Sequence, residues 1–332
     1  MMAVVVDFFI LTVQVFGHIL HALIQWVKKP REKLVRNNIC LITGAASANG
    51  IGRLFALEFA RRGAILVLWD VDAEGNESTA QEVRKLGAKA YTYTCDVSRK
   101  EVVYGAADCV RREVGHVSIL VNNAGIVSGK SILQCPDEQL ERTMRTNCHA
   151  HFWTVKAFLP QMIKRGHGHI VTIAGSLGLF ATGYLEDYCA SQFAVVGFHE
   201  ALSHELKVKR IDSVKTTLVC PYFIDTGMFH GCGIRQELEG LLSPLKPDHF
   251  VKTAVQGILR NQHMICIPRV IYFVAISKNF TNAGTENLCR LLHRQQASLL
   301  PWDVQVLIQN FLGLDKCIPQ KATYHHSAAR RC

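Results

Sequence analysis

From position 39 the chain reads Ile39-Cys40-Leu41-Ile42-Thr43-Gly44-Ala45-Ala46-Ser47-Ala48-Asn49-Gly50-Ile51-Gly52-Arg53. The apolar run at the start favours a β-strand, and the glycines after it favour a tight turn into a helix. Glycines at such a turn let the backbone approach a pyrophosphate, whose negative charge is met by the helix N-terminus. The stretch therefore predicts a phosphate-binding turn after the first strand of an alternating unit.

Strand-like and helix-like patterns alternate through the chain after this turn. Further short β-rich runs are Ile65–Trp69, Tyr91–Cys95, Ile119–Val121, Ile170–Ile173 and Thr216–Cys220. The helical stretches between the strands are Arg53–Arg62, Ala73–Leu86, Lys100–Val114, Leu140–Lys164 and Tyr188–Leu206. Continuous apolar strands separated by amphipathic helices indicate a parallel sheet covered on both faces. We therefore expect an α/β fold of the Rossmann type, a doubly wound parallel sheet in a single domain over residues 37–275.

The bulk composition is that of one large folded domain, because 49% of the 332 residues are hydrophobic and 19% are charged. The formal charge of +10 comes without a nucleic-acid-binding motif, so no nucleic-acid partner is expected. Basic residues near the first apolar stretch suggest a nearby membrane, and an ordinary solvated surface explains them equally well. The twelve cysteines form no Cys-x-x-Cys pair, which indicates reduced thiols in a cytosol-facing domain. No ligand cluster predicts a metal.

Both ends of the chain carry apolar segments outside this domain. Residues 1–27 are predominantly apolar and suffice for the roughly 20 residues that cross a bilayer. Basic residues at 28–36 follow them and would hold the next domain in the cytosol. We predict an N-terminal membrane-anchor helix at 1–27 and a basic juxtamembrane linker at 28–36, with a helix lying in the membrane interface as the alternative. Residues 276–332 are expected to form a helical or membrane-associated extension and tail.

Two apolar patches near the C-terminus allow more than one interpretation. They are Met264–Ala275 and Leu299–Leu314, interrupted by prolines and basic residues. They could wall a substrate site or touch lipid, and ordinary packing helices explain the pattern equally well.

Asp70 ends the second predicted strand, 26 residues after Gly44. A carboxylate at this place accepts hydrogen bonds from the adenosine ribose hydroxyls and repels a 2′-phosphate. NAD is therefore favoured over NADP as the cofactor. In the alternative interpretation, Asp70 only opens the following loop or caps a helix.

The chain resembles the short-chain dehydrogenases/reductases over roughly residues 37–275. The motifs that carry the resemblance are Asp96-Val97, Asn122-Asn123-Ala124-Gly125, Asn147, Tyr188 and Pro221. Within that family it is similar to the membrane-anchored retinol dehydrogenases, through Cys135-Pro136-Asp137-Glu138, Asn147-Cys148-His149-Ala150-His151-Phe152-Trp153, Ser176-Leu177-Gly178-Leu179-Phe180 and Cys220-Pro221-Tyr222.

This resemblance implies NAD-dependent oxidation of all-trans-retinol, or of a similar lipophilic alcohol, to the aldehyde. It implies an endoplasmic reticulum membrane protein whose catalytic domain faces the cytosol, with lipid droplets as a second location. A homo-oligomer, or a hetero-oligomer with a related dehydrogenase, is also implied.

The same resemblance assigns roles to individual residues. Tyr188 would be the general base for alcohol oxidation, and Asn147 would anchor a water that relays the proton. Asp96 would contact adenine, and Thr226 would hold the nicotinamide carboxamide. The expected cofactor-binding residues are Gly44, Ser47, Gly50, Ile51, Gly52, Asp70, Asp96, Val97, Asn123, Gly125, Pro221 and Thr226.

Three departures from the family pattern bear on activity. The family has a serine 13 residues before the tyrosine, and this chain has Gly175 there. The family has a lysine four residues after the tyrosine, and this chain has Gln192 there. The phenol therefore lacks the ammonium that lowers its pKa. The glycine turn is also two residues longer than the family's spacing. Ser176 and Gln192 are the candidate replacements, so an active dehydrogenase and a pseudoenzyme that retains the fold as a binding or regulatory partner both remain open.

Overall fold

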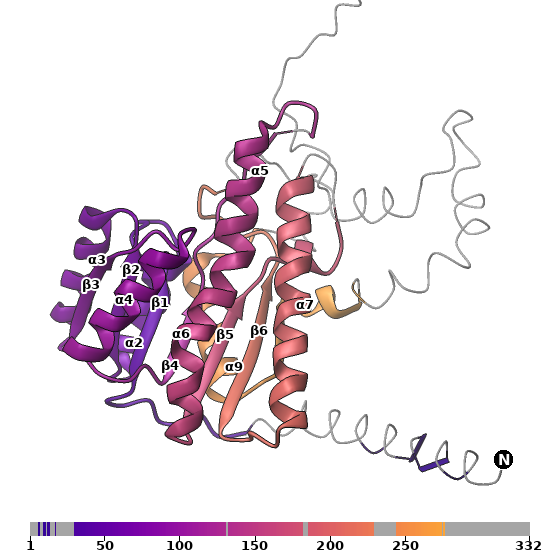
Figure 1. Ribbon diagram of the computed structural model, residues 1–332, viewed down its shortest axis with the longest axis horizontal. Coiled ribbons are helices and arrows are strands. Elements are labelled where there is room, and N and C mark those ends of the chain that lie inside the picture. Colours follow the sequence, from indigo (N-terminus) through magenta and orange to yellow (C-terminus); the bar gives the residue numbers. More distant parts are fainter. Residues whose placement is uncertain are drawn as a thin grey trace, which may run out of the picture.

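A sheet of seven parallel strands forms the centre of the molecule (Figure 1). The computed structural model describes residues 30–130, 132–181, 185–228, 244–273 and 275, with the single positions 6, 9, 10, 12, 13 and 17. The strand order is β3-β2-β1-β4-β5-β6-β7. The strands are β1 (Ile39–Thr43), β2 (Ile65–Asp70), β3 (Ala90–Thr94), β4 (Ile119–Asn122), β5 (Gly168–Ile173), β6 (Val214–Pro221) and β7 (Met264–Ile267). The predicted doubly wound parallel sheet is confirmed.

Helices cover both faces of this sheet (Figure 1). One face packs against α2 (Ile51–Arg61), α3 (Ala73–Lys85) and α9 (Pro247–Leu259). The other face packs against α4 (Lys100–Glu113), α6 (Ala150–Lys164) and α7 (Glu186–Val208). Successive strand residues point to opposite faces. Leu41 accordingly packs with the second group of helices, and its neighbour Ile42 packs with the first. This double burial explains why the strands are continuous apolar runs.

The seventh strand was not expected from the sequence. Met264–Ile267 belongs to the patch for which a substrate wall, a lipid contact or packing helices were expected. It forms β7 and pairs in parallel with β6, where Cys266 lies opposite Cys220. A run of four apolar residues is too short for its periodicity to separate a strand from a helix. Pairing with an existing sheet edge decided its conformation.

The long helical stretch predicted at Leu140–Lys164 is interrupted. It begins as α5 (Asp137–Met144), passes through the π-helical turn η1 (Arg145–His149), and continues as α6. A π turn widens the helix by one residue and is often found at functional sites. The turn contains Asn147, so it sets the direction of that side chain.

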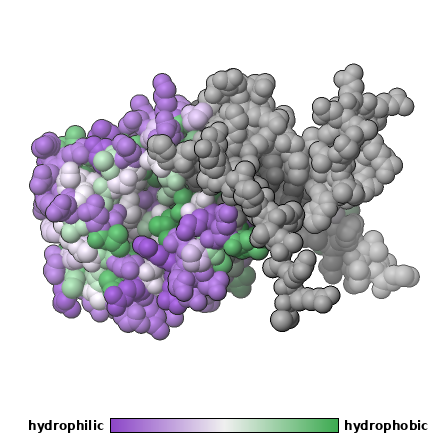
Figure 2. Space-filling view, turned by 90° about the horizontal axis from the view of Figure 1, so that it is seen from above, coloured by the Kyte–Doolittle hydropathy of each residue, from purple (hydrophilic) through white to green (hydrophobic). Residues whose placement is uncertain are grey.

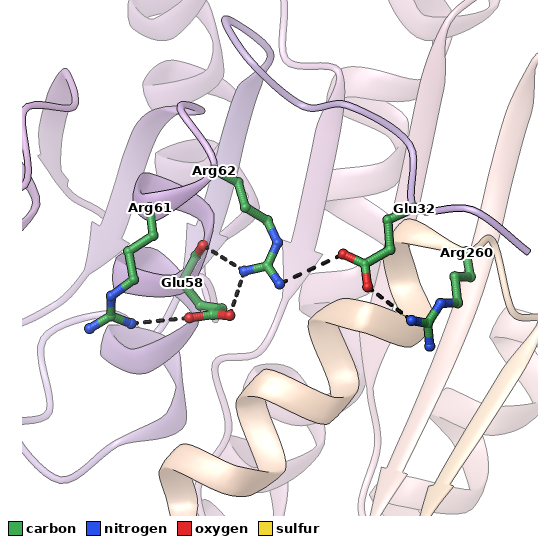
Figure 3. A network of polar contacts seen from close by, with 5 residues as sticks. All are labelled: Glu32, Glu58, Arg61, Arg62 and Arg260. Atoms are coloured by element: carbon green, nitrogen blue, oxygen red, sulfur yellow. Dashed lines mark hydrogen bonds and ion pairs between the residues drawn. The ribbon is translucent and has the colours of Figure 1, made fainter. Parts of the chain in front are cut away.

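Part of the segment predicted as a linker packs against the domain. The carboxylate of Glu32 lies 3.0 Å from Arg260 and 3.8 Å from Arg62, which joins the C-terminal ends of α9 and α2 (Figure 3). The backbone N–H of Lys33 donates to the Leu259 carbonyl at 2.9 Å, and Val35 is buried. The chain is therefore held to the domain for several residues before β1 begins.

The predicted anchor at 1–27 and the C-terminal extension at 276–332 lie almost entirely outside the described residues. Among the helices that the structure describes, none combines the length and apolarity needed to cross a bilayer.

Candidate active site

A cavity of about 980 Å³ opens at the carboxyl ends of the strands. Ligands of open α/β sheets bind at this edge. Figure 2 views the molecule from above, with hydrophilic residues around the periphery of the described part and hydrophobic residues toward its middle. Every site residue proposed from the sequence lines the cavity: Tyr188, Asn147, Ser176, Gln192, Gly44, Ser47, Gly50, Ile51, Gly52, Asp70, Asp96, Val97, Asn123, Gly125, Pro221 and Thr226.

The glycine turn has the geometry that a pyrophosphate requires. Gly44 adopts a φ of +72°, a conformation that L side chains rarely tolerate. A Cβ on Gly52 would lie 2.1 Å from the Gly44 carbonyl oxygen, so only glycine permits this approach. Helix α2 starts at Ile51 without a side-chain cap and without an acidic residue in its first turn. The first N–H groups of a helix have no acceptor within that helix, and Ile51 and Gly52 line the cavity, so this helix start fits an anionic group of a dinucleotide.

Asp70 lies where the adenosine end of a dinucleotide would be expected. Its carboxylate accepts hydrogen bonds from the backbone N–H groups of Ala46 at 2.8 Å and Asp72 at 3.1 Å. Asp72, rather than Asp70, caps α3. A carboxylate has about four acceptor sites, so Asp70 retains capacity for ribose hydroxyls. The guanidinium of Arg53, in the first turn of α2, is paired with Glu82 at 2.9 Å.

Thr43 and Asn123 join the ends of β1 and β4 beneath the cavity. The Thr43 hydroxyl accepts the backbone N–H groups of Asn123 and Ala124, each at 3.0 Å. The Asn123 amide donates to the carbonyls of Thr43 at 2.9 Å and Gly44 at 3.1 Å. The glycine turn is therefore held in place from the neighbouring strand. Asn123 has a structural task in addition to the cofactor contact predicted for it.

Asn147 braces three segments of the site. Its side-chain oxygen accepts the Ile126 N–H at 2.8 Å, and its side-chain nitrogen donates to the Ile126 carbonyl at 2.8 Å and to the Ser191 hydroxyl at 3.0 Å. The Ser191 hydroxyl donates in turn to the Tyr188 carbonyl at 2.7 Å. Both amide hydrogens are thus engaged. A relay water at this side chain would have to use the remaining acceptor capacity of the oxygen.

Tyr188 is 7% exposed and directs its hydroxyl toward Gly175. A Cβ built on Gly175 would lie 3.0 Å from that hydroxyl oxygen. A side chain at residue 175 would therefore be in direct contact with the Tyr188 hydroxyl. Burial raises the pKa of the Tyr188 phenol above its ordinary value, and the neighbouring Cys189 thiol raises it further.

Gln192 follows Tyr188 by one turn of α7 and is 5% exposed. Its side-chain oxygen accepts the backbone N–H of Gly175 at 2.7 Å. The two positions that depart from the family pattern are thus in direct contact. Ser176 opens the short 3₁₀ helix η2 (Ser176–Gly178) and is buried in the cavity wall.

Residues 38–236 match the family described as short chain dehydrogenase. The chain belongs to this family. It is 51% identical to retinol dehydrogenase 10 of Homo sapiens, a match that covers 96% of this chain and 94% of the relative.

Two solved structures show the same fold at 24% identity. A short-chain dehydrogenase/reductase from Burkholderia phymatum in complex with NAD matches with a TM-score of 0.67, over 81% of this chain and 100% of the other. A metagenomic short-chain oxidoreductase in complex with NADP matches with a TM-score of 0.58, over 70% of this chain and 96% of the other.

Two supporting residues of the site were not singled out from the sequence. Thr43 ends the first strand, and Ser191 follows Tyr188 by three residues on the buried side of α7. Thr43 is a polar residue at the end of an apolar run, which is a usable signal because buried hydroxyls must find partners, whereas Ser191 stands beside Gln192 and gives no such signal. Their partners lie 80 and 44 residues away in the chain. Such pairings cannot be read from local sequence.

Proposed function

We propose that this chain is an NAD-dependent oxidoreductase of the retinol dehydrogenase type. It would oxidise all-trans-retinol, or a similar lipophilic alcohol, to the aldehyde by hydride transfer. The observation that carries the proposal is the Tyr188 hydroxyl, directed toward Gly175 in the same cavity as the glycine turn. The likeness to retinol dehydrogenase 10 over nearly the whole chain supports the choice of substrate.

NAD is proposed over NADP on the chemistry around the second strand. Asp70 places a negative charge at the cavity edge, which would repel a 2′-phosphate. Arg53, a cation that could have offset this repulsion, is already paired with Glu82. The free N–H groups at the start of α2 would meet the pyrophosphate. Bound NAD would supply the hydride acceptor and a positive ring charge beside the phenol.

Tyr188 would take the proton of the alcohol as hydride leaves its carbinol carbon. An uncharged neighbour makes this harder, because burial raises the pKa of the phenol and Gln192 carries no ammonium that would lower it. The side-chain oxygen of Gln192 accepts the Gly175 N–H, so the side-chain nitrogen of Gln192 is the atom that can donate toward the cavity. We propose that it serves as a neutral donor in the place of the family's lysine, and that Ser176 partly replaces the family's serine.

An apolar wall faces these groups and suits a hydrocarbon substrate. The wall includes Val127, Leu177, Leu185, Tyr222, Phe223 and Met228. Burying an isoprenoid chain against such side chains stabilises the complex by roughly 25 cal/mol per Å² of apolar surface.

We propose that the entrance to the cavity faces lipid at the endoplasmic reticulum membrane and that the catalytic domain lies in the cytosol. Lipid droplets are proposed as a second location. The proposed assembly is a homo-oligomer, or a hetero-oligomer with a related dehydrogenase.

Membranes carrying the protein, incubated with all-trans-retinol and NAD, test this proposal. Tyr188→Phe should abolish retinal formation, because an acid or base in position contributes typically ~10²–10⁴ in rate. Tyr93→Phe is the matched control, since that hydroxyl donates to Glu113 and lies outside the cavity lining. Turnover that survives Tyr188→Phe unchanged rejects the assignment.

A pseudoenzyme is the second candidate, favoured by the contact between Gly175 and Gln192. That hydrogen bond joins the two positions at which the family pattern has a hydroxyl and an ammonium, and neither group is present here. Such a protein would keep the fold and act as a binding or regulatory partner. Calorimetric titration with NAD, run beside the retinol assay, separates the two, because binding without turnover supports the pseudoenzyme.

A further inference from the structure

A cluster of buried polar side chains lies between the sheet and helices α6 and α7, one helical turn beyond Asn147. Its members are Asn122 of β4, His151 and Thr154 of α6, Thr172 of β5, and His199 of α7. All of them are buried. None of the five lines the cavity.

Hydrogen bonds and strand pairing bring the cluster together. The Thr154 hydroxyl donates to the side-chain oxygen of Asn122 at 2.8 Å. Asn122 is the register partner of Thr172 on the neighbouring strand. The Thr172 hydroxyl lies 2.9 Å from Nδ1 of His199. His151 is on the same side of α6 as Thr154, three residues earlier, and it interacts electrostatically with His199.

Three polar atoms of this cluster have no hydrogen-bond partner among the described residues. They are the side-chain nitrogen of Asn122, Nδ1 of His151 and Nε2 of His199. Burial lowers the pKa of His151 to about 3 and of His199 to about 4, so both rings are neutral at physiological pH. A neutral imidazole offers one donor and one acceptor, and leaving either unpaired in the interior costs free energy.

A third buried histidine, His169, shows the difference. His169 lies 2.6 Å from the Lys33 ammonium through Nδ1 and 2.8 Å from the Thr217 hydroxyl through Nε2. Both of its ring nitrogens are therefore satisfied by protein groups. His151 and His199 are equally buried, but each has one ring nitrogen without a partner among the described residues, so their site has room in its hydrogen bonding for a small polar ligand.

We propose that Asn122, His151 and His199 together bind one buried water molecule. Buried waters typically make about three hydrogen bonds to otherwise unsatisfied groups, and this cluster holds three such groups. Because a water donates up to two hydrogen bonds and accepts up to two, it satisfies the Asn122 amide and both histidines whenever the three groups are neither all donors nor all acceptors. It ties the sheet to α6 and α7.

A crystal structure of the full chain at high resolution tests the proposal directly. An isolated density peak should lie within about 3.2 Å of the Asn122 amide and of one ring nitrogen of each histidine. Absence of the peak, or a direct hydrogen bond between the two histidine rings, overturns it.

Thermal unfolding of paired variants supplies an independent readout. His151→Leu and His199→Leu should each lower the melting temperature by several degrees, because each leaves the remaining groups of the cluster unpaired. The double variant should lose clearly less than the sum of the two single losses. Thr79→Val is the control partner for His199→Leu, since Thr79 is buried on α3 and donates to Ala45. That pair should be additive. Additive losses for the two histidines would overturn a shared water.

Discussion

The side-chain oxygen of Gln192 accepts the backbone N–H of Gly175 at 2.7 Å, so the two substitutions in the catalytic pattern depend on each other. Glutamine can accept this hydrogen bond and lysine cannot. Replacing only Gln192 therefore leaves the Gly175 N–H without its acceptor. Replacing only Gly175 places a Cβ 3.0 Å from the Tyr188 hydroxyl, which must then shift by a few tenths of an ångström.

Restoring both residues should raise the rate more than either change alone. We expect Gly175→Ser with Gln192→Lys to increase kcat/KM for retinol by about 10² or more, because an ammonium lowers the phenol pKa and a hydroxyl donates to the reacting oxygen. Steady-state kinetics of the four proteins, the natural chain, two single variants and the double variant, measure the coupling. No gain in the double variant would mean that Gln192 and Ser176 already suffice. A gain of several orders of magnitude would mean that the natural chain is catalytically silenced.

Asp70→Asn should weaken the preference for NAD. The asparagine oxygen can still accept the Ala46 N–H, whereas the negative charge that repels a 2′-phosphate is lost. We expect the ratio of NADP to NAD affinity to rise about tenfold, the equivalent of 1.4 kcal/mol. Calorimetric titration with both cofactors measures it. Asp72→Asn, at the α3 cap two residues on, should leave the ratio unchanged. An unaltered ratio in Asp70→Asn would remove the argument for NAD.

Gly52→Ala should disrupt the phosphate-binding turn. The new methyl group would lie 2.1 Å from the Gly44 oxygen and 2.7 Å from the Asn123 side-chain nitrogen. Overpacking of this kind costs roughly 1–3 kcal/mol, and displacing the turn should also weaken NAD binding. Denaturant unfolding and cofactor titration report the two effects. Gly105→Ala on α4 is the matched control, because nothing lies within 4 Å of its Cβ and alanine favours a helix by about 1 kcal/mol. Equal behaviour of the two variants would contradict this account of the turn.

Stability should fall when the pH is lowered from 7.5 to 5.5. The pKa of His151 is lowered to about 3 by burial and by His199, and that of His199 to about 4 by burial and by His263, so neither protonates in the folded state within this range. In the unfolded chain both protonate near pH 6.5, which stabilises that state as the pH falls. Each histidine then costs roughly 1–2 kcal/mol per pH unit below 6.5.

Melting temperatures across this pH range measure the effect. His199→Gln should reduce the slope, and His204→Gln, at an exposed position of α7, should not. A flat profile for the natural chain would show that these histidines are not held neutral.

Local sequence was sufficient to predict the strand-turn-helix unit at residues 39–53, the alternation of elements and the parallel sheet. The reason is that strand periodicity, helix periodicity and glycine stereochemistry are properties of neighbouring residues. It also placed Tyr188 and Gln192 one helical turn apart on one face of a helix, because i and i+4 share a face.

Tertiary structure alone decided the rest. The strand conformation of Met264–Ile267 depends on pairing with β6, and the π turn around Asn147 accompanies contacts to Ile126 and Ser191. The bond between Gln192 and Gly175 joins a helix to the end of a strand 17 residues earlier. Each of these features is a contact between distant segments, and its energy is gained only when the whole sheet has assembled. The sequence therefore identified the chemical groups of the site, whereas the folded core determined which of them are in contact.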